Sequence, residues 1–372
     1  MSENSTYLYW GTEVGLSKPC YAPIVDFLFK LLYGASSSKN DELSLTPIKM
    51  KCLEGSTKDS KLFHDKEGGE TNARTIIGEV FQKGAYNHLL SHLKSQKKES
   101  FHIVDAGANI GSFSIFMGSK IENCTIYAME VVDKTRQVLI NNLEKCAIIK
   151  PSSNVYIVPM GLIGGKNPET APSTLSFYHF VCQPSNSTSM DTVKLKHDSM
   201  MKALMDPTKK LFSHRFGSSW PVLTTFNSLL PFSFMRGMVQ RTYVAYLYRY
   251  KKVEVKLGSI EDVISNTPSS MPPAIDLVKI DTEGMELANL MAISKDTWSR
   301  IQTLAVEIHD TRKDELLNAE KKLKSEGLEN VWHLPDFEYN KRGANKHLLT
   351  ASRLTFSKEV EDEMIDEGFT KL

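Results

Sequence analysis

The sequence predicts an α/β fold: a doubly wound, mostly parallel sheet with helices on both faces. From about residue 101, short apolar segments of strand type alternate with segments whose apolar residues recur at helical spacing. The strand-like segments are nearly continuous apolar runs, such as "FHIVDAG" and "CTIYAMEV", which is typical of parallel strands buried on both faces. Alternation of such strands with helices indicates repeated βαβ units.

Seven strands and four helices are expected in this alternation. We place the strands at 101–107, 124–131, 154–161, 274–281, 303–310, 328–334 and 347–354. Helical spacing of apolar residues, together with a terminating Gly327, places the helices at 110–119, 133–145, 284–293 and 313–327.

Three regions fall outside the alternation. Residues 1–75 lack strong periodicity and are expected to be an N-terminal extension to a domain at 76–356. Residues 184–250 form a basic, aromatic insertion without Glu, which we interpret as a helical lid on the body. The alternative is a surface for an anionic substrate, or for peripheral contact with an anionic membrane. Residues 357–372 are an acidic C-terminal tail, expected to present a solvated helix face.

Composition limits the function classes. The chain has 372 residues with 45 Lys+Arg against 44 Asp+Glu, and this balance disfavours nucleic acid as a partner. Five cysteines without a CxxC pair fit a reducing compartment. No secretory signal and no apolar run long enough to span a membrane are evident, so an intracellular, cytoplasmic location is expected. The oligomeric state is left open.

The stretch "DAGANIG" ends the first predicted strand and opens a helix, where an α/β sheet binds its ligand. Its spacing lacks the third glycine of a dinucleotide fingerprint, and Asp105 would repel a pyrophosphate. A cationic ligand without phosphate, S-adenosylmethionine (SAM), fits better than the nucleotide of an oxidoreductase. Glu130 ends the second strand, where a carboxylate can accept hydrogen bonds from a ribose diol. Gly161 ends the third predicted strand, where the adenine of SAM could lie.

Three motifs together resemble the FkbM family of SAM-dependent methyltransferases. They are "VDAGANIGSFSIF", "IDLVKIDTEGMELANLM" and "LAVEIHD", in family order, and the resemblance covers about 77–355 apart from the insertion. It implies a class I methyltransferase (Rossmann-like) fold, SAM as cofactor and O-methylation of a hydroxyl on a small-molecule, sugar or lipid-like acceptor. Val131 and Ala292 depart from the proline and glycine usual in the family. The cofactor-binding residues expected on these grounds are Asp105, Gly107, Ala108, Asn109, Gly111, Glu130, Val131 and Gly161.

The second and third motifs carry the candidate catalytic residues. Lys279 and Asp281 share one face of a strand, as do Glu307 and His309 of a probable neighbour, so their ends should meet beside the cofactor. Asp281 or Glu283 is expected to hold the acceptor hydroxyl or take its proton, with His309 as a second candidate base. Apart from catalysis, these residues have two structural explanations. Lys279 and Glu307 would form a structural ion pair, while Glu283 and Glu286 would favour the helix dipole.

Two further alternatives concern the activity. A metal ion bound by Asp, Glu and His is less favoured, because no close ligand spacing such as HExxH occurs. A methyltransferase-like scaffold that binds a partner through the basic insertion and catalyses nothing is the other alternative. Retention of Asp105, Asn109, Gly111 and Glu130 together with Asp281 and Glu283 favours the enzyme.

Overall fold

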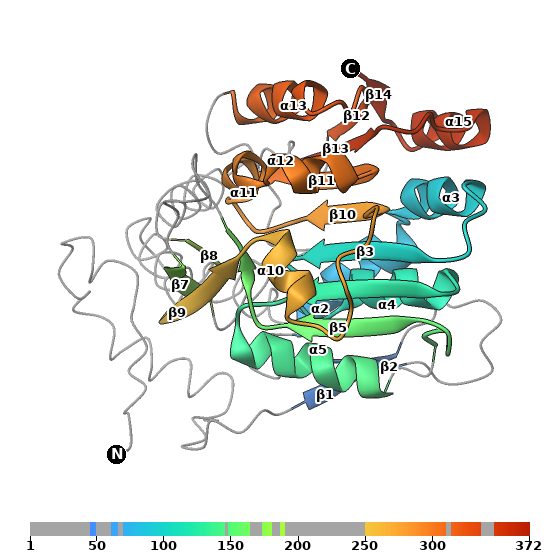
Figure 1. Cartoon of the computed structure of the whole chain (residues 1–372). Coiled ribbons are helices and arrows are strands. Elements are labelled where there is room, and N and C mark those ends of the chain that lie inside the picture. The colour runs from blue at the N-terminus through green and yellow to red at the C-terminus, as the bar shows by residue number, and fades with distance from the viewer. Residues whose placement is uncertain are drawn as a thin grey trace, which may run out of the picture.

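The computed structural model contains a main sheet of eight strands, a smaller sheet of four and a two-stranded sheet (Figure 1). It describes residues 45–49, 61–65, 70–145, 148–163, 173–180, 187–189, 250–309, 314–335 and 346–372. The predicted insertion therefore lies outside the described residues, apart from 187–189 and Tyr250.

The main sheet confirms the predicted doubly wound architecture. Its strand order is β14-β12-β13-β11-β10-β3-β4-β5, with β3 (Phe101–Ala106) beside β10 (Leu277–Ile280) at the point where the order reverses. The strands β5, β4, β3, β10 and β11 run parallel, and β13 lies antiparallel between β11 and β12. This is the class I methyltransferase arrangement. The other strands are β4 (Cys124–Met129), β5 (Asn154–Val158), β11 (Thr303–His309), β12 (Asn330–Pro335), β13 (Lys346–Ser352) and β14 (Thr370–Lys371).

Seven of these eight strands match the prediction, and β14 was missed. The two residues of β14 are exposed and pair antiparallel with β12 at Trp332 and His333. So short an edge strand has no alternating pattern that sequence analysis could detect.

Helices cover both faces of the main sheet because alternate strand residues point to opposite sides. Phe101 and Ile103 pack with α3 (Asn87–Ser95) and α4 (Ser112–Lys120) on one face. Val104 and Ala106 pack on the other face with a second group of helices. That group is α10 (Ile260–Ser265), α11 (Glu286–Ala292), α12 (Lys295–Arg300) and α13 (Glu315–Ser325).

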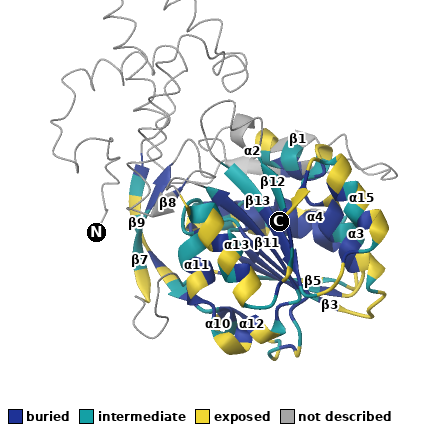
Figure 2. Ribbon diagram, turned by 90° about the horizontal axis from the view of Figure 1, so that it is seen from above, coloured by how far each residue is buried: buried dark blue, intermediate teal, exposed yellow. Residues whose placement is uncertain are grey.

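The predicted helices at 110–119, 133–145, 284–293 and 313–327 are confirmed as α4, α5 (Asp133–Lys145), α11 and α13. In α5, Val138 and Leu139 are buried, as their spacing predicts. Figure 2 shows the strands of the main sheet buried between helices whose outer faces are exposed. None of the helices in the described ranges has the length and apolar character that crossing a membrane requires.

Some regular structure precedes the domain predicted to begin at 76. The strands β1 (Leu45–Lys49) and β2 (Lys61–Asp65) form an antiparallel pair, and β2 packs beside α5. The helix α2 (Glu70–Ile77) continues directly into the π-helical turn η1 (Gly78–Gln82).

The smaller sheet has the order β6-β9-β7-β8 and adjoins the predicted insertion. Its members are β6 (Gly161–Leu162), β7 (Thr174–Phe180), β8 (Thr188–Ser189) and β9 (Tyr250–Gly258). The arrowheads of β3 and β10 point to the side of the molecule where β7, β8 and β9 lie (Figure 1). The smaller sheet therefore stands on the carboxyl-end side of the main sheet, where α/β folds bind ligands.

The C-terminal residues pack on the body rather than lying apart from it. The helix α15 (Lys358–Asp366) lies against α3, and its Val360 and Met364 are buried with Trp332, Phe356 and Phe369. The predicted acidic tail is thus an amphipathic helix whose acidic side is solvated. The acidic segment "EVEDEMIDEG" contains two apolar residues, Val360 and Met364, which are four positions apart and therefore share one helix face.

We expect Met364→Ala to lower the free energy of unfolding by about 2–4 kcal/mol, because it empties a fully buried site. The neighbouring Ile365 is 57% exposed, so Ile365→Ala should change stability by less than about 0.5 kcal/mol. Urea unfolding monitored by circular dichroism measures both values. Equal losses for the two variants would show that α15 does not stabilise the body.

Candidate active site

The turn after β3 brings the first and second motifs into contact. Gly107 has φ +82°, and a Cβ there would lie 1.9 Å from the backbone oxygen of Asp281. Gly111 has φ +91°, and a Cβ there would meet Leu139 at 2.4 Å. Gly107 is therefore required by close contact with backbone as well as by its conformation, whereas Gly111 is required by its conformation. The predicted cofactor turn and the predicted catalytic loop are in direct backbone contact.

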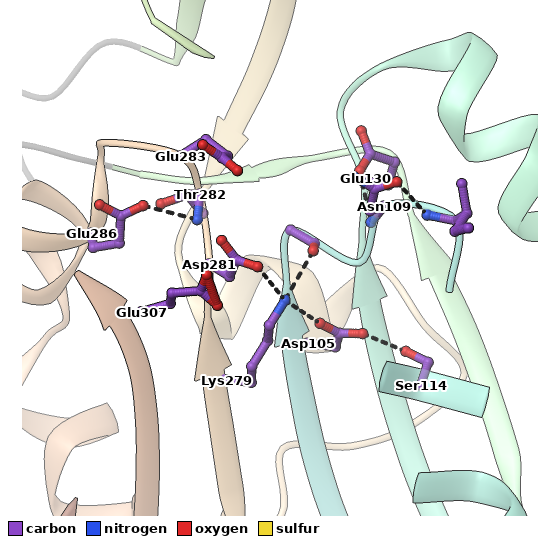
Figure 3. A network of polar contacts seen from close by, with 12 residues as sticks. Asp105, Asn109, Ser114, Glu130, Lys279, Asp281, Thr282, Glu283, Glu286 and Glu307 are labelled. Carbon is purple, nitrogen blue, oxygen red and sulfur yellow. Dashed lines mark hydrogen bonds and ion pairs between the residues drawn. The ribbon is translucent and has the colours of Figure 1, made fainter. Parts of the chain in front are cut away.

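Asp105, the last but one residue of β3, is fully buried and points toward α4. Its Oδ2 accepts a hydrogen bond of 2.6 Å from Ser114 Oγ, and its Oδ1 lies 3.4 Å from Lys279 Nζ (Figure 3). Sheet register explains the ion pair, because Asp105 and Lys279 are directly opposite on β3 and β10. These two contacts tie Asp105 to α4 and β10, and its direct action on a ligand stays a prediction.

Lys279 joins the two sides of the site. Its Nζ donates to the backbone oxygen of Gly107 at 3.1 Å and lies 3.4 Å from Asp281 Oδ2. Burial alone would lower the pKa of Lys279, but the carboxylates of Asp281 and Asp105 outweigh it and hold the pKa above its ordinary value of 10.5. Burial alone would raise the pKa of Asp281, but Lys279 and other cations hold it below 3.8. Lys279 and Asp281 are therefore charged together.

The predicted ion pair between Lys279 and Glu307 is wrong. Lys279 lies opposite Asp105 on one side and Ala305 on the other, so Glu307 is two positions further along β11. Glu307 instead forms an ion pair with Lys346 of β13, the strand antiparallel to β11. The sequence offered no sign of Lys346, because its proximity depends on the long-range register of β13.

Glu130 lies at the end of β4 in the position predicted for a ribose partner. Its Oε2 accepts from the Asn109 backbone N–H at 2.9 Å, and its Oε1 accepts from the Val132 N–H at 2.8 Å. Burial raises the pKa of Glu130 to about 7, although these hydrogen bonds oppose the increase. A carboxylate oxygen can accept more than one hydrogen bond, so both oxygens retain capacity for a diol.

The remaining predicted cofactor residues line the same edge. The Ala108 N–H donates to the Met129 backbone oxygen at 2.8 Å, which joins the turn to the end of β4. At Gly161 a Cβ would lie 2.9 Å from Val131 Cγ1, so the residues that follow β4 contact the start of β6. Ala108, Asn109, Glu130, Val131 and Gly161 are thus brought together, whereas Asp105 lies beneath the edge.

A second polar group surrounds His309 at the end of β11. Glu286, which is almost fully buried, accepts from the backbone N–H groups of Thr282 and Gly284 at 3.2 and 2.7 Å. His309 Nδ1 lies 3.2 Å from Glu286 Oε1, and His309 Nε2 lies 3.5 Å from Glu283 Oε2. Burial alone would raise the pKa of Glu286, but His309 and the Gly284 N–H hold it below 4.5. Glu286, considered in the sequence only for the helix dipole, therefore orients His309.

Glu283 occupies a strained position at the rim. Its φ is +56°, a left-handed conformation that non-glycine residues rarely adopt. Gly284 follows with φ +105°, so the chain turns sharply before α11 begins. Such backbone strain is often found at functional sites. Asp281, Glu307 and His309 each offer one ligand atom, and these three atoms lie within 4.8 Å of one another.

The edge fits a SAM molecule chemically. SAM carries an ammonium, a sulfonium, a carboxylate and a ribose diol. Among the described residues, Glu130 offers a carboxylate for the diol, and the adjoining ends of β10 and β11 hold more carboxylates than ammonium groups, which suits the two cations. Neither Lys279 nor Lys346 presents an unopposed positive charge, because each is paired with a carboxylate.

We expect Lys279→Met to lower the free energy of unfolding by about 3–5 kcal/mol, because it leaves the buried Asp105 carboxylate without a counter-charge. The double variant Asp105→Asn/Lys279→Met should recover part of this loss, while Lys252→Met, at an exposed position, should have little effect. Chemical denaturation measures all three. A loss for Lys279→Met no larger than that for Lys252→Met would contradict the role of the buried ion pair.

Comparison with known proteins gives two curated relatives, both from fungi. "Methyltransferase sdnD" of Sordaria araneosa is 28% identical over 240 residues, which cover 63% of this chain and 74% of the relative. "Methyltransferase 1" of Beauveria bassiana is 26% identical over 235 residues, covering 63% of this chain and 75% of the relative. No protein-family model matches the chain.

Among solved structures, similarity is weak. The FkbM methyltransferase of Methylobacillus flagellatus has 13% identity and a TM-score of 0.36, covering 76% of this chain and 55% of that one. The METTL16 MTase domain has 12% identity and a TM-score of 0.37, covering 74% of this chain and 69% of that one.

The strand order, the described motifs and the two curated relatives therefore agree. On these grounds the chain is a methyltransferase, and its motifs resemble those of the FkbM type.

Proposed function

We propose that this methyltransferase transfers the methyl group of SAM to a hydroxyl oxygen of an uncharged small-molecule, sugar or lipid-like acceptor. The observation that carries this proposal is the contact between the two motifs at Gly107 and Asp281. That contact puts the carboxylate rim of β10 and β11 beside the cofactor turn. A hydroxyl acceptor needs such a neighbour, because its proton must leave as the new bond forms.

The charge of the rim supports an uncharged acceptor. Among the described residues, four carboxylates at the rim (Asp281, Glu283, Glu286 and Glu307) stand against the two ammonium groups of Lys279 and Lys346. An anionic acceptor such as a nucleic acid would be repelled at this edge. Hydrogen-bonding hydroxyls would be held by the carboxylate oxygens instead.

When bound, SAM supplies a methyl group on a positively charged sulfur, which keeps the bonding electron pair as the acceptor oxygen forms the new carbon–oxygen bond. The chain's own residues hold the reactants in line. Glu130 would fix the ribose, and the turn at 107–111 would seat the charged end. Positioning of this kind can supply several kcal/mol of the reduction in barrier.

Glu283 is the proton acceptor that we favour among the candidates. The Asp281 carboxylate is held charged by Lys279, which makes it a weak base and suits it to orienting the hydroxyl. Glu283 stands at the partly exposed rim in a strained conformation, and its Oε2 faces His309. His309 is the second candidate base, with Glu286 fixing the orientation of its ring.

The affinity for SAM should depend on the protonation of Glu130. The pKa of Glu130 is about 7, and only the ionised carboxylate accepts both diol hydroxyls. Below this pKa, binding of SAM must therefore remove a proton from Glu130. The Kd for SAM at about pH 6 should accordingly be roughly tenfold higher than at about pH 8. Isothermal titration calorimetry across this range measures the slope. Glu130→Gln should bind more weakly with a flatter profile, and an identical slope in this variant would contradict the assignment.

Glu283→Gln should lower turnover about 100-fold or more while leaving the Kd for SAM within roughly twofold. The assay follows labelled methyl groups from SAM into hydroxyl-containing products of a cell extract. Glu329→Gln, at an exposed position, is the matched control and should retain full turnover. A wild-type chain that binds SAM but transfers no methyl group would support the non-catalytic scaffold instead.

A further inference from the structure

We propose that Asp281, Glu307 and His309 bind one divalent metal ion at the rim of the sheet. The proposal deepens the proposed function, on which its role in catalysis rests, because the ion would lie where the acceptor hydroxyl is expected. The binding itself can be tested without substrate or SAM.

The geometry of the three side chains suits a single ion. Glu307 and His309 are two residues apart on β11, so they share one face of the sheet, and Asp281 directly follows the adjacent parallel strand β10. Figure 3 shows Glu307 beside Asp281 at the ends of these strands. Ligand atoms of one octahedral ion are about 3 Å apart when adjacent and about 4.2 Å apart when opposite. The three separations here are all within 4.8 Å, so binding an ion requires side-chain rotations that draw the ligand atoms closer together.

Asp281 provides an oxygen for coordination. Its Oδ2 is held by Lys279, whereas its Oδ1 is buried and has no hydrogen-bond partner among the described residues. A buried carboxylate oxygen without a partner is costly, and its presence calls for an explanation. A cation bound by Oδ1 would satisfy that oxygen without disturbing the ion pair with Lys279.

His309 is placed as metal-binding histidines usually are. A coordinating histidine donates its other ring N–H to a carboxylate or carbonyl oxygen, which fixes its tautomer. Here each ring nitrogen faces a carboxylate, Glu286 at Nδ1 and Glu283 at Nε2. Whichever nitrogen binds the ion, the other retains an acceptor for its proton. A neutral imidazole without a cation would leave one nitrogen lone pair facing a carboxylate oxygen.

The excess of carboxylates at the rim favours a cation, and Lys346 is the competitor for this role. Its ammonium pairs with Glu307 and also lowers the pKa of Asp281. With Lys346 included, the described residues of the rim still carry more carboxylates than ammonium groups. We therefore expect Lys346 to weaken metal binding but not to replace it.

Two carboxylate oxygens and one imidazole nitrogen favour Mn²⁺ among the available divalent ions, because the oxygens suit hard ions and the nitrogen suits transition metals. An acceptor hydroxyl bound to the ion would lose its proton more readily. Glu283 would take that proton, leaving the oxygen to form the bond to the methyl carbon.

The test uses the full chain after treatment with a chelator and dialysis. The electron paramagnetic resonance signal measures the Mn²⁺ that remains free in solution, and its loss on adding the protein should correspond to one bound ion per chain. Spin-echo modulation should show coupling to a single imidazole nitrogen, which His309→Gln removes. Glu307→Gln and His309→Gln should each raise the Kd for Mn²⁺ about tenfold or more. His333→Gln, a histidine on β12 outside the cluster, should bind as wild type does. Lys346→Met should bind more tightly.

Three outcomes would overturn the proposal. The first is a wild-type chain that binds no stoichiometric Mn²⁺ at millimolar concentration. The second is bound Mn²⁺ without nitrogen coupling, a result that needs no variant to fold. The third is binding only in Lys346→Met, which would show that this ammonium already fills the site. Calorimetric titration of the chelator-treated protein with SAM separates these outcomes from failure of the proposed function, because SAM binding should persist without metal.

Discussion

The arrangement of the site depends on the buried ammonium of Lys279. It lies between Asp105 and Asp281 and donates to the backbone of the turn that contains Gly107. One side chain thus joins β3, β10 and the turn between the cofactor edge and the acceptor rim. Removing Lys279 or one of its carboxylate partners would leave a buried charge without a counter-charge, so the cluster is stable only when all three groups are present.

The sheet explains why so many charges are tolerated here. Ile103 and Val104 of β3 and Leu277 and Val278 of β10 are apolar, whereas Asp105 and Lys279 stand last but one in their strands, next to the carboxyl edge. Register then places opposite charges side by side, as with Asp105 and Lys279. Gly107 lets the two loops approach until their backbones touch. A larger residue there would separate the cofactor turn from the groups that receive the acceptor.

The negative charge of the rim affects the choice of both the cofactor and the acceptor. In the part of the chain that the structure describes, carboxylates outnumber ammonium groups at the ends of β10 and β11, so the edge favours cations and hydroxyl donors over anions. A sulfonium cofactor, an uncharged acceptor and a divalent ion all satisfy this condition. His309 has a carboxylate near each ring nitrogen, Glu286 at Nδ1 and Glu283 at Nε2, and these two groups orient its ring.

The sequence by itself determined the seven principal strands, the helices between them and the motifs that place Glu130, Asp281, Glu283, Glu307 and His309 at one edge. These follow from local periodicity and from the rule that parallel strands end together. Only the tertiary structure decided which charges pair. Lys279 meets Asp105 rather than Glu307, Ser114 and Lys346 join the network, and α15 packs on the body. Lateral partners depend on strand order and register, which contacts between residues far apart in the chain establish and no short stretch of sequence encodes.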